Sequence, residues 1–190
     1  SVENFNDTRS SRLGKSVLIK NFKKYAEMFP DDQEIQWVAS ERLSGSTPTY
    51  LQKAYTNGGY YILRNKWDDQ SMMMILKNNN TNKKYHCQPD NGTFSLYKGG
   101  RNFFPDAGSY AYSGSDRESY RETARHNTLT IMSKTIPDDS MKGKLLQLTT
   151  KTDESTSYDV LVTENPTYTV SAEKHLNLTH RRSVFFVNQK

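Results

Sequence analysis

Residues able to bind a metal or move a proton recur through the middle of the chain. His86 and Gln88 alternate along residues 84–88, which are expected to form a strand, so both side chains point to one face. Asp106 follows Gln88 by 18 residues, and His126 follows Asp106 by 20, which is compatible with neighbouring strands of a meander. Imidazole nitrogens, carboxylates and amide oxygens all bind divalent metals. On spacing alone, a partly buried histidine bonded to backbone is the favoured interpretation, and a metal site is the alternative.

A series of short strands must position these residues. Runs rich in β-branched, aromatic or other apolar residues alternate with turn signals such as Asn57-Gly58-Gly59 and Asn91-Gly92. The density of these runs favours an antiparallel sheet system, and specifically a β-sandwich, over a βαβ fold. The expected strands are 60–63, 71–76, 84–88, 93–97, 102–104, 128–132, 144–148, 158–162 and 183–187.

The beginning of the chain has a different character. Apolar side chains recur at helical spacing over residues 18–29, and a shorter helix is expected over 34–38. Residues 44–48 are rich in turn formers and mark a boundary. We therefore predict a helical segment with a linker in residues 1–48 and a β-sandwich domain in residues 49–190.

The composition limits the classes of function. The 190 residues carry 26 Lys+Arg against 21 Asp+Glu, and this net charge of +5 fits a polyanion, either nucleic acid or acidic polysaccharide. A single Cys excludes an intramolecular disulfide framework and a Cys-rich zinc module. No apolar run is long enough to span a membrane, and the first residues lack the pattern of a signal peptide. We therefore expect no membrane partner.

Three longer strings in the middle of the chain form a specific block: residues 86–94 (HCQPDNGTF), 100–110 (GRNFFPDAGSY) and 121–128 (RETARHNT). This block resembles the heparinase II/III family, and within it the heparan-sulfate lyases. Shorter similar strings stand upstream and downstream of that block, at residues 5–9, 55–60, 165–168 and 180–187. The resemblance thus covers essentially the whole chain, and it favours an acidic polysaccharide over nucleic acid as the partner.

The resemblance implies a particular architecture and activity. Family enzymes join a helical α/α toroid to an antiparallel β-sandwich, with the active site between them. Residues 1–48 would be the end of a truncated toroid, and residues 49–190 a sandwich that is incomplete at its C-terminus. The implied function is cleavage of heparan sulfate by β-elimination at uronic acid residues. The catalytic Asn and Tyr of the toroid would lie upstream, so the fragment is expected to be inactive alone.

The resemblance also implies roles for the residues in the block. His86 matches the catalytic histidine of the sandwich. Relatives carry a second histidine two positions later that binds zinc together with an Asp and a later His, but Gln88 stands there in this chain. The implied ligands are Gln88, Asp106 and His126. Because this set is richer in oxygen, calcium or manganese becomes as plausible as zinc. The metal's implied role is structural, holding strands so that His86 faces the cleft.

The remaining expectations concern substrate, location and alternatives. Arg101, Arg125 and Asn91 are the candidate substrate contacts, since Arg side chains bind planar anions. The partners are heparan sulfate and the upstream toroid of the same protein, with no nucleic acid, and the implied location is the bacterial periplasm. Two alternatives stay open. One is a non-catalytic β-sandwich that binds acidic polysaccharide, and the other is a lyase for another uronate polymer such as alginate or chondroitin.

Overall fold

The computed structural model describes residues 14–79, 88–108, 113–131, 143–153, 156–168 and 178–189. The helical elements in these ranges are α1 (Lys15–Met28), α2 (Gln33–Ala39), α3 (Ser115–Arg121) and the 3-10 turn η2 (Thr123–Arg125). The strands are β1 (Gln52–Tyr55), β2 (Tyr60–Arg64), β3 (Met72–Lys77), β4 (Thr93–Lys98), β5 (Arg101–Asn102), β6 (Lys144–Thr152), β7 (Thr156–Tyr168) and β8 (Leu178–Gln189).

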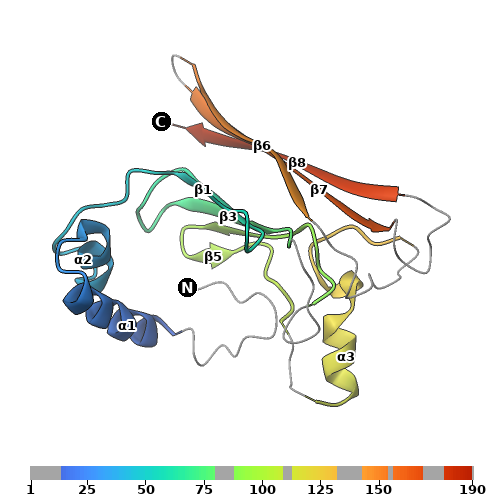
Figure 1. Cartoon of the computed structure of the whole chain (residues 1–190), viewed down its shortest axis with the longest axis horizontal. Helices are drawn as coiled ribbons and strands as arrows, with labels where there is room; N and C mark the ends of the chain where they lie inside the picture. Colours follow the sequence, from blue (N-terminus) through green and yellow to red (C-terminus); the bar gives the residue numbers. More distant parts are fainter. Residues whose placement is uncertain are drawn as a thin grey trace.

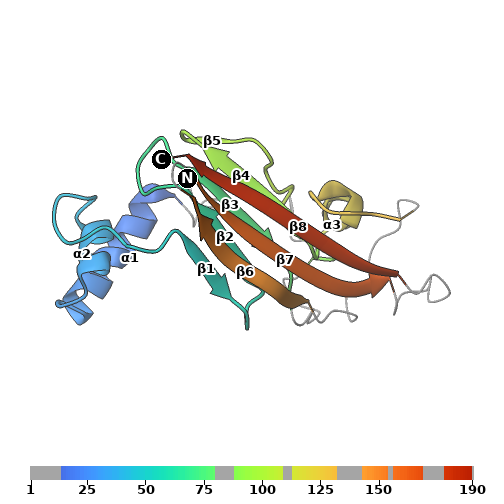
Figure 2. The same ribbon diagram turned by 90° about the horizontal axis from the view of Figure 1, so that it is seen from above.

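The strands form two antiparallel sheets that lie in layers. Sheet A has the order β1-β2-β3-β4-β5, and sheet B has the order β6-β7-β8. Figures 1 and 2 show sheet B covering one face of sheet A, with α1 and α2 at one end of the sheets and α3 at the other. The fold is therefore mainly β, as the strand pattern predicted, with a few helices at its ends.

The apolar core lies between the two sheets. Tyr61 and Leu63 alternate along β2 and stand opposite Leu76 and Met74 of β3, so these four side chains share one face. That face meets sheet B in a buried cluster made of Tyr61, Leu63, Met74, Leu76, Leu161 and Phe186. Burying each such side chain contributes about 1.5–3 kcal/mol, so this cluster fixes how the layers stack.

A second junction between the sheets is polar and lies where β3 ends. We call Lys77, Asn78 and Asn79 the polar anchor, because all three are buried and bind other segments. Asn78 Nδ2 donates to Glu164 O at 3.0 Å, and Asn165 Nδ2 donates to Asn78 Oδ1 at 3.1 Å, which ties β3 to β7. The anchor thus fixes the end of sheet A against sheet B through directed hydrogen bonds.

Most expected strands are present. The predictions for β2, β3, β4, β6, β7 and β8 are confirmed. The strand expected at 102–104 is confined to Arg101–Asn102, because Asn102 Oδ1 accepts from Phe104 N at 3.1 Å and ends the ladder. Of the strand expected at 84–88, only Gln88 lies in the described part of the chain, and it is not in a strand.

The strand expected at 128–132 is wrong for its described residues, 128–131. Asn127 Nδ2 lies 3.1 Å from each of three backbone carbonyl oxygens, those of Phe94, Phe104 and Pro105. Thr128 Oγ1 donates to Asn91 O at 2.6 Å. Hydrogen bonds from side chains to the backbone compete with strand pairing, and here residues 128–131 form no strand.

The helices at the start of the chain are confirmed as α1 and α2. Asp32 caps α2, since its Oδ1 accepts from Glu34 N at 3.0 Å and Ile35 N at 2.9 Å. Helix α3 and strand β1 were not expected from the sequence. None of the helices in the described ranges is both long and apolar enough to cross a bilayer.

Candidate metal centre beside the predicted catalytic segment

Three chain segments meet beside the polar anchor. They are the turn at 88–92 that leads into β4, the loop after β5 with Asp106, and the end of η2 with His126. Thr123 Oγ1 donates to Pro89 O at 2.6 Å and so holds η2 against the turn. Gly92 has φ +79°, and a Cβ there would lie 2.6 Å from His180 Cε1, so this turn requires glycine.

Asp90, Asp106 and His126 form a compact buried cluster. Each offers one ligand atom, and these atoms lie within 4.8 Å of one another. His126 Nδ1 is 2.9 Å from Asp106 Oδ2, and both side chains are fully buried. Asp106 Oδ1 accepts from Gly108 N at 2.9 Å, which orients the carboxylate. This is a group of residues that could hold a metal ion.

The polar anchor adds a fixed positive charge to the cluster. Lys77 Nζ lies 2.5 Å from Asp90 Oδ1, and both side chains are completely buried. Burial raises the pKa of the Asp90 carboxyl, whereas the charges of Lys77 and His126 act in the opposite direction. Lys77 therefore compensates one of the two carboxylates that face each other here.

Three buried side-chain atoms in these segments lack partners among the described residues. Gln88 Oε1, Asp90 Oδ2 and His126 Nε2 are all buried, and none has a hydrogen-bond partner in the described part of the protein. Leaving such an atom buried and unsatisfied costs about 1–3 kcal/mol. All three can donate a lone pair to a divalent metal. The donor set therefore fits a metal ion, although it does not identify one.

The structure brings together the three predicted metal ligands. Gln88 Nε2 donates to Gly108 O at 2.8 Å, and Gly108 N in turn donates to Asp106, which places Gln88 beside that loop. His126 bonds directly to Asp106. The predicted catalytic residue, His86, lies outside the described residues, two positions before Gln88.

The predicted substrate contacts are placed differently from one another. Arg101 and Arg125 are exposed. Asn91 is fully buried, and its amide bonds to the backbone of Asn79, with Asn91 Oδ1 accepting from Asn79 N at 2.9 Å. The two arginines are open to solvent, while the Asn91 side chain is part of the junction with the polar anchor.

Sequence reasoning missed two members of this site, Asp90 and Lys77. Asp90 carried a usable signal, since it stands two positions after Gln88 within the block 86–94. Lys77 carried none, because a lysine at the end of a strand is ordinarily solvated. The burial of Lys77 is accompanied by its ion pair with Asp90, a contact that the sequence does not reveal.

His180, on β8, is another buried residue near the turn. Its ring packs against Gly92, and its Nδ1 has no hydrogen-bond partner among the described residues. Burial, assisted by the charge of Arg182, lowers the pKa of His180 to about 4. His180 is therefore neutral at pH 7.

Fold and site together define a class of protein: a two-sheet antiparallel sandwich with a buried Asp/Asp/His cluster between its loops. Comparison with known proteins makes the assignment specific. The family model described as Heparinase II/III-like, C-terminal, matches residues 47–190, and the chain belongs to this family.

Curated relatives are lyases. The chain is 37% identical over 179 residues to a heparin-sulfate lyase of Bacteroides stercoris and 40% identical over 205 aligned positions to one of Bacteroides thetaiotaomicron. These alignments cover 92% and 100% of this chain but only 25% and 27% of the relatives. The chain thus spans about a quarter of the length of the proteins it matches.

Solved structures agree with this assignment. The heparan sulfate lyase HepC of Pedobacter heparinus superposes with a TM-score of 0.82 at 35% identity, covering 100% of this chain and 28% of that one. A crystal structure of heparinase III gives a TM-score of 0.79 at 39% identity, covering 98% of this chain and 28% of that one. The two-sheet fold is therefore that of the corresponding part of heparinase III.

Proposed function

We propose that this chain is the sandwich part of a polysaccharide lyase that cleaves heparan sulfate by β-elimination at uronic acid residues. The observation that supports this proposal is the buried cluster of Asp90, Asp106 and His126, which lies next to Gln88. Gln88 stands two positions after His86 in the sequence. Asn79 and Gln88 are both buried, and Asn79 belongs to the polar anchor.

The proposed reaction sets three chemical requirements. The uronate carboxylate must be neutralised so that the C5 proton becomes acidic. A base removes that proton, the bond between C4 and O4 breaks, and an acid protonates the departing O4. The C5–H electron pair becomes the C4–C5 double bond, so no oxidant or external nucleophile is needed.

In this proposal, His86 is the catalytic residue that the sandwich supplies. A neutral imidazole near pH 7 suits proton abstraction or support of the substrate carboxylate. The toroid expected upstream supplies an Asn that neutralises the carboxylate and a Tyr for proton transfer. Because such groups act as a unit, the 190-residue fragment is expected to be inactive alone.

A structural metal ion completes the proposal. Gln88, Asp106 and His126 would hold it, with Asp90 as a further oxygen donor compensated by Lys77. Zinc, calcium and manganese are the candidates, because the set combines oxygen donors with one imidazole. When bound, the ion supplies a cross-link between three loops, and this cross-link would keep the His86 segment aimed at the cleft.

Substrate binding and location are part of the same proposal. Arg101 and Arg125 are exposed and could bind sulfate or carboxylate groups of the polysaccharide. A periplasmic site of action is proposed from family membership alone.

The first test uses the whole protein that contains this chain. Incubation with heparan sulfate, chondroitin and alginate should give ultraviolet absorbance from an unsaturated uronate with heparan sulfate. Absorbance with alginate or chondroitin alone would transfer the proposal to another uronate polymer. If none of the three polysaccharides gave a product, the lyase proposal would be rejected. The remaining alternative would be a non-catalytic β-sandwich that binds acidic polysaccharide.

The second test addresses His86. In the whole protein, His86→Ala should lower kcat by about 100-fold or more, the size of a general acid–base contribution. His175→Ala is the matched control, since it removes a histidine to which no role is assigned. An unchanged rate in His86→Ala, with heparan sulfate still bound, would sink the catalytic assignment.

A further inference from the structure

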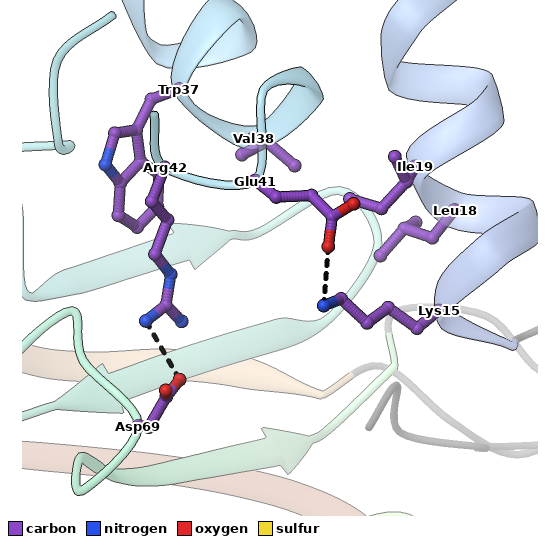
Figure 3. A pocket seen from close by; sticks show the side chains of 8 residues that line it. All are labelled: Lys15, Leu18, Ile19, Trp37, Val38, Glu41, Arg42 and Asp69. Atoms are coloured by element: carbon purple, nitrogen blue, oxygen red, sulfur yellow. Dashed lines mark ion pairs between the residues drawn. The ribbon is translucent and has the colours of Figure 1, made fainter. Parts of the chain in front are cut away.

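A pocket of about 450 Å³ opens where α1, α2 and the loop between β2 and β3 meet (Figure 3). The cluster of Asp90, Asp106 and His126 lies at the opposite end of sheet A. Strand β3 connects the two places, since Met72 begins it near the pocket and Lys77 ends it at the polar anchor. Five residue steps of about 3.3 Å each separate Met72 from Lys77 by roughly 17 Å. The pocket is therefore distinct from the candidate metal centre.

The pocket walls combine an apolar face with two ion pairs. Leu18 on α1 and Val38 on α2 are apolar lining residues, and the indole of Trp37 lies across the pocket from Leu18, beside Arg42. On the polar side, Lys15 Nζ lies 2.6 Å from Glu41 Oε2, and Arg42 Nη1 lies 2.9 Å from Asp69 Oδ1. Both pairs are largely exposed, and exposed pairs gain little from their own contact. A ligand can therefore exchange with them at small cost.

The backbone that presents this polar side is strained. Helix α2 ends in a Schellman motif, in which Arg42 N donates to Trp37 O at 2.8 Å and Glu41 N donates to Val38 O at 3.1 Å. Glu41 has φ 56° and Arg42 has φ 78°, left-handed values that usually require glycine. Ending a helix does not explain two strained side chains in a row. Both side chains lie on the pocket wall, and such strain concentrates at ligand-binding sites.

The arginine is held in a defined orientation. Arg42 Cζ lies 5.3 Å from the centre of the Trp37 ring, and Trp37 packs edge-to-face on Trp67 at 5.9 Å. The guanidinium thus lies between the Trp37 ring and the Asp69 carboxylate. A planar guanidinium in this position suits a carboxylate or sulfate.

We propose that this pocket binds one acidic sugar unit, as a saccharide site separate from the catalytic one. Arg42 and Lys15 receive its anionic group, the carboxylate of Glu41 accepts from its hydroxyls, and the Trp37 indole packs on the C–H face of its ring, while Asp69 competes with the ligand for Arg42. The unit can belong to a remote part of a long chain or to a short free oligosaccharide. The inference goes beyond the proposed function, because it concerns binding without cleavage.

Isothermal titration with a size-defined heparan sulfate tetrasaccharide tests the proposal in the whole protein, with His86→Ala as background to prevent turnover. Arg42→Gln should weaken binding at this site about tenfold or more, since a charge-assisted contact is lost. Asp69→Asn should tighten it several-fold, because it removes the carboxylate that competes for Arg42. Lys66→Gln is the matched control, as Lys66 pairs with Asp68 in the same loop but does not line the pocket.

Opposite shifts for Arg42→Gln and Asp69→Asn support the site. If both variants bind within twofold of the background protein, the proposal is overturned. Should Arg42→Gln fail to fold, Asp69→Asn still decides, because its side chain is 86% exposed. Were the protein not a lyase, these shifts would persist without any product, so the two proposals fail separately. When the tetrasaccharide shifts are present, active Arg42→Gln protein distinguishes the two sources. A KM for long heparan sulfate chains that is also raised identifies a remote segment of a long chain, and an unchanged KM identifies a short free oligosaccharide.

Discussion

The two ends of sheet A carry ion pairs of the same chemical kind in opposite surroundings. At one end, Lys77 and Asp90 lie 2.5 Å apart with both side chains 0% exposed. At the other end, Lys15 and Glu41 lie 2.6 Å apart with side chains 78% and 49% exposed. Distance does not distinguish the pairs, but solvent does. A buried pair is costly to break, whereas an exposed pair exchanges readily with water or a ligand.

The largest expected effect comes from breaking the buried pair. Lys77→Met should destabilise the fold by about 3–5 kcal/mol, because it leaves Asp90 buried without its counter-charge. Chemical unfolding measures the loss. Lys15→Met, the matched control at the exposed end, should leave the unfolding midpoint unchanged within error. Equal effects at the two ends would refute the contrast.

Metal removal should give the next largest loss of stability, and it should act only at the end of sheet A that carries Asp106 and His126. Metal present at about 100 times its Kd stabilises a protein by about 2.7 kcal/mol, so a chelator should lower Tm markedly. Asp106→Ala should lack the metal in elemental analysis and should not respond to the chelator. Equal, near-zero metal content in the wild type and Asp106→Ala would dismiss the site. Arg42→Gln at the other end should keep the metal of the wild type.

Acid should also act on the buried end, through His180. Its folded pKa of about 4 lies below the unfolded value of 6.5, so the unfolded state takes up the proton first. The stability from burying neutral His180 is present above pH 6.5 and is lost as the pH falls from 6.5 to 4. The expected loss is about 1–2 kcal/mol after allowance for solvent screening. His180→Gln should flatten this part of a plot of unfolding free energy against pH. An unchanged slope would contradict the assignment.

The smallest expected effect is a change in Tm at the exposed end, where backbone strain and not an ion pair decides the outcome. Glu41→Gly relieves one left-handed residue and gives up only an exposed ion pair, so Tm should rise by roughly 1–3 °C. Glu27→Gly, the same substitution inside α1, should instead lower Tm by roughly 2–4 °C. Calorimetry compares the two. A lower Tm in Glu41→Gly would show that the strain is not costly.

Much of the sandwich could be predicted from local pattern. The alternation of Tyr61 with Leu63 and the Asn-Gly turns are local signals, so β2, β3 and β4 were expected in place. Residues 128–131 carried the same kind of signal, but Asn127 and Thr128 bond to carbonyls 33 or more positions earlier in the sequence or on the β5 loop. A local pattern cannot represent partners that distant.

The candidate site also contains residues that the sequence predicted and residues that only the fold brought in. Gln88, Asp106 and His126 could be proposed from a resemblance to family motifs, and the structure places them together. Asp90 and Lys77 joined the site only through the fold, because β3 ends where the turn before β4 passes. The helix-end pocket likewise depends on α1 and α2 meeting the β2–β3 loop.

The sequence by itself determined the strand alternation, the family and the residue types of a metal site, since these depend on side-chain order along the chain. Tertiary structure alone decided which charges are buried. Lys77 and Lys15 are the same residue type, and each lies close to a carboxylate. One is enclosed by two sheets and the other faces water, and the energy of a charge pair depends on the surrounding dielectric.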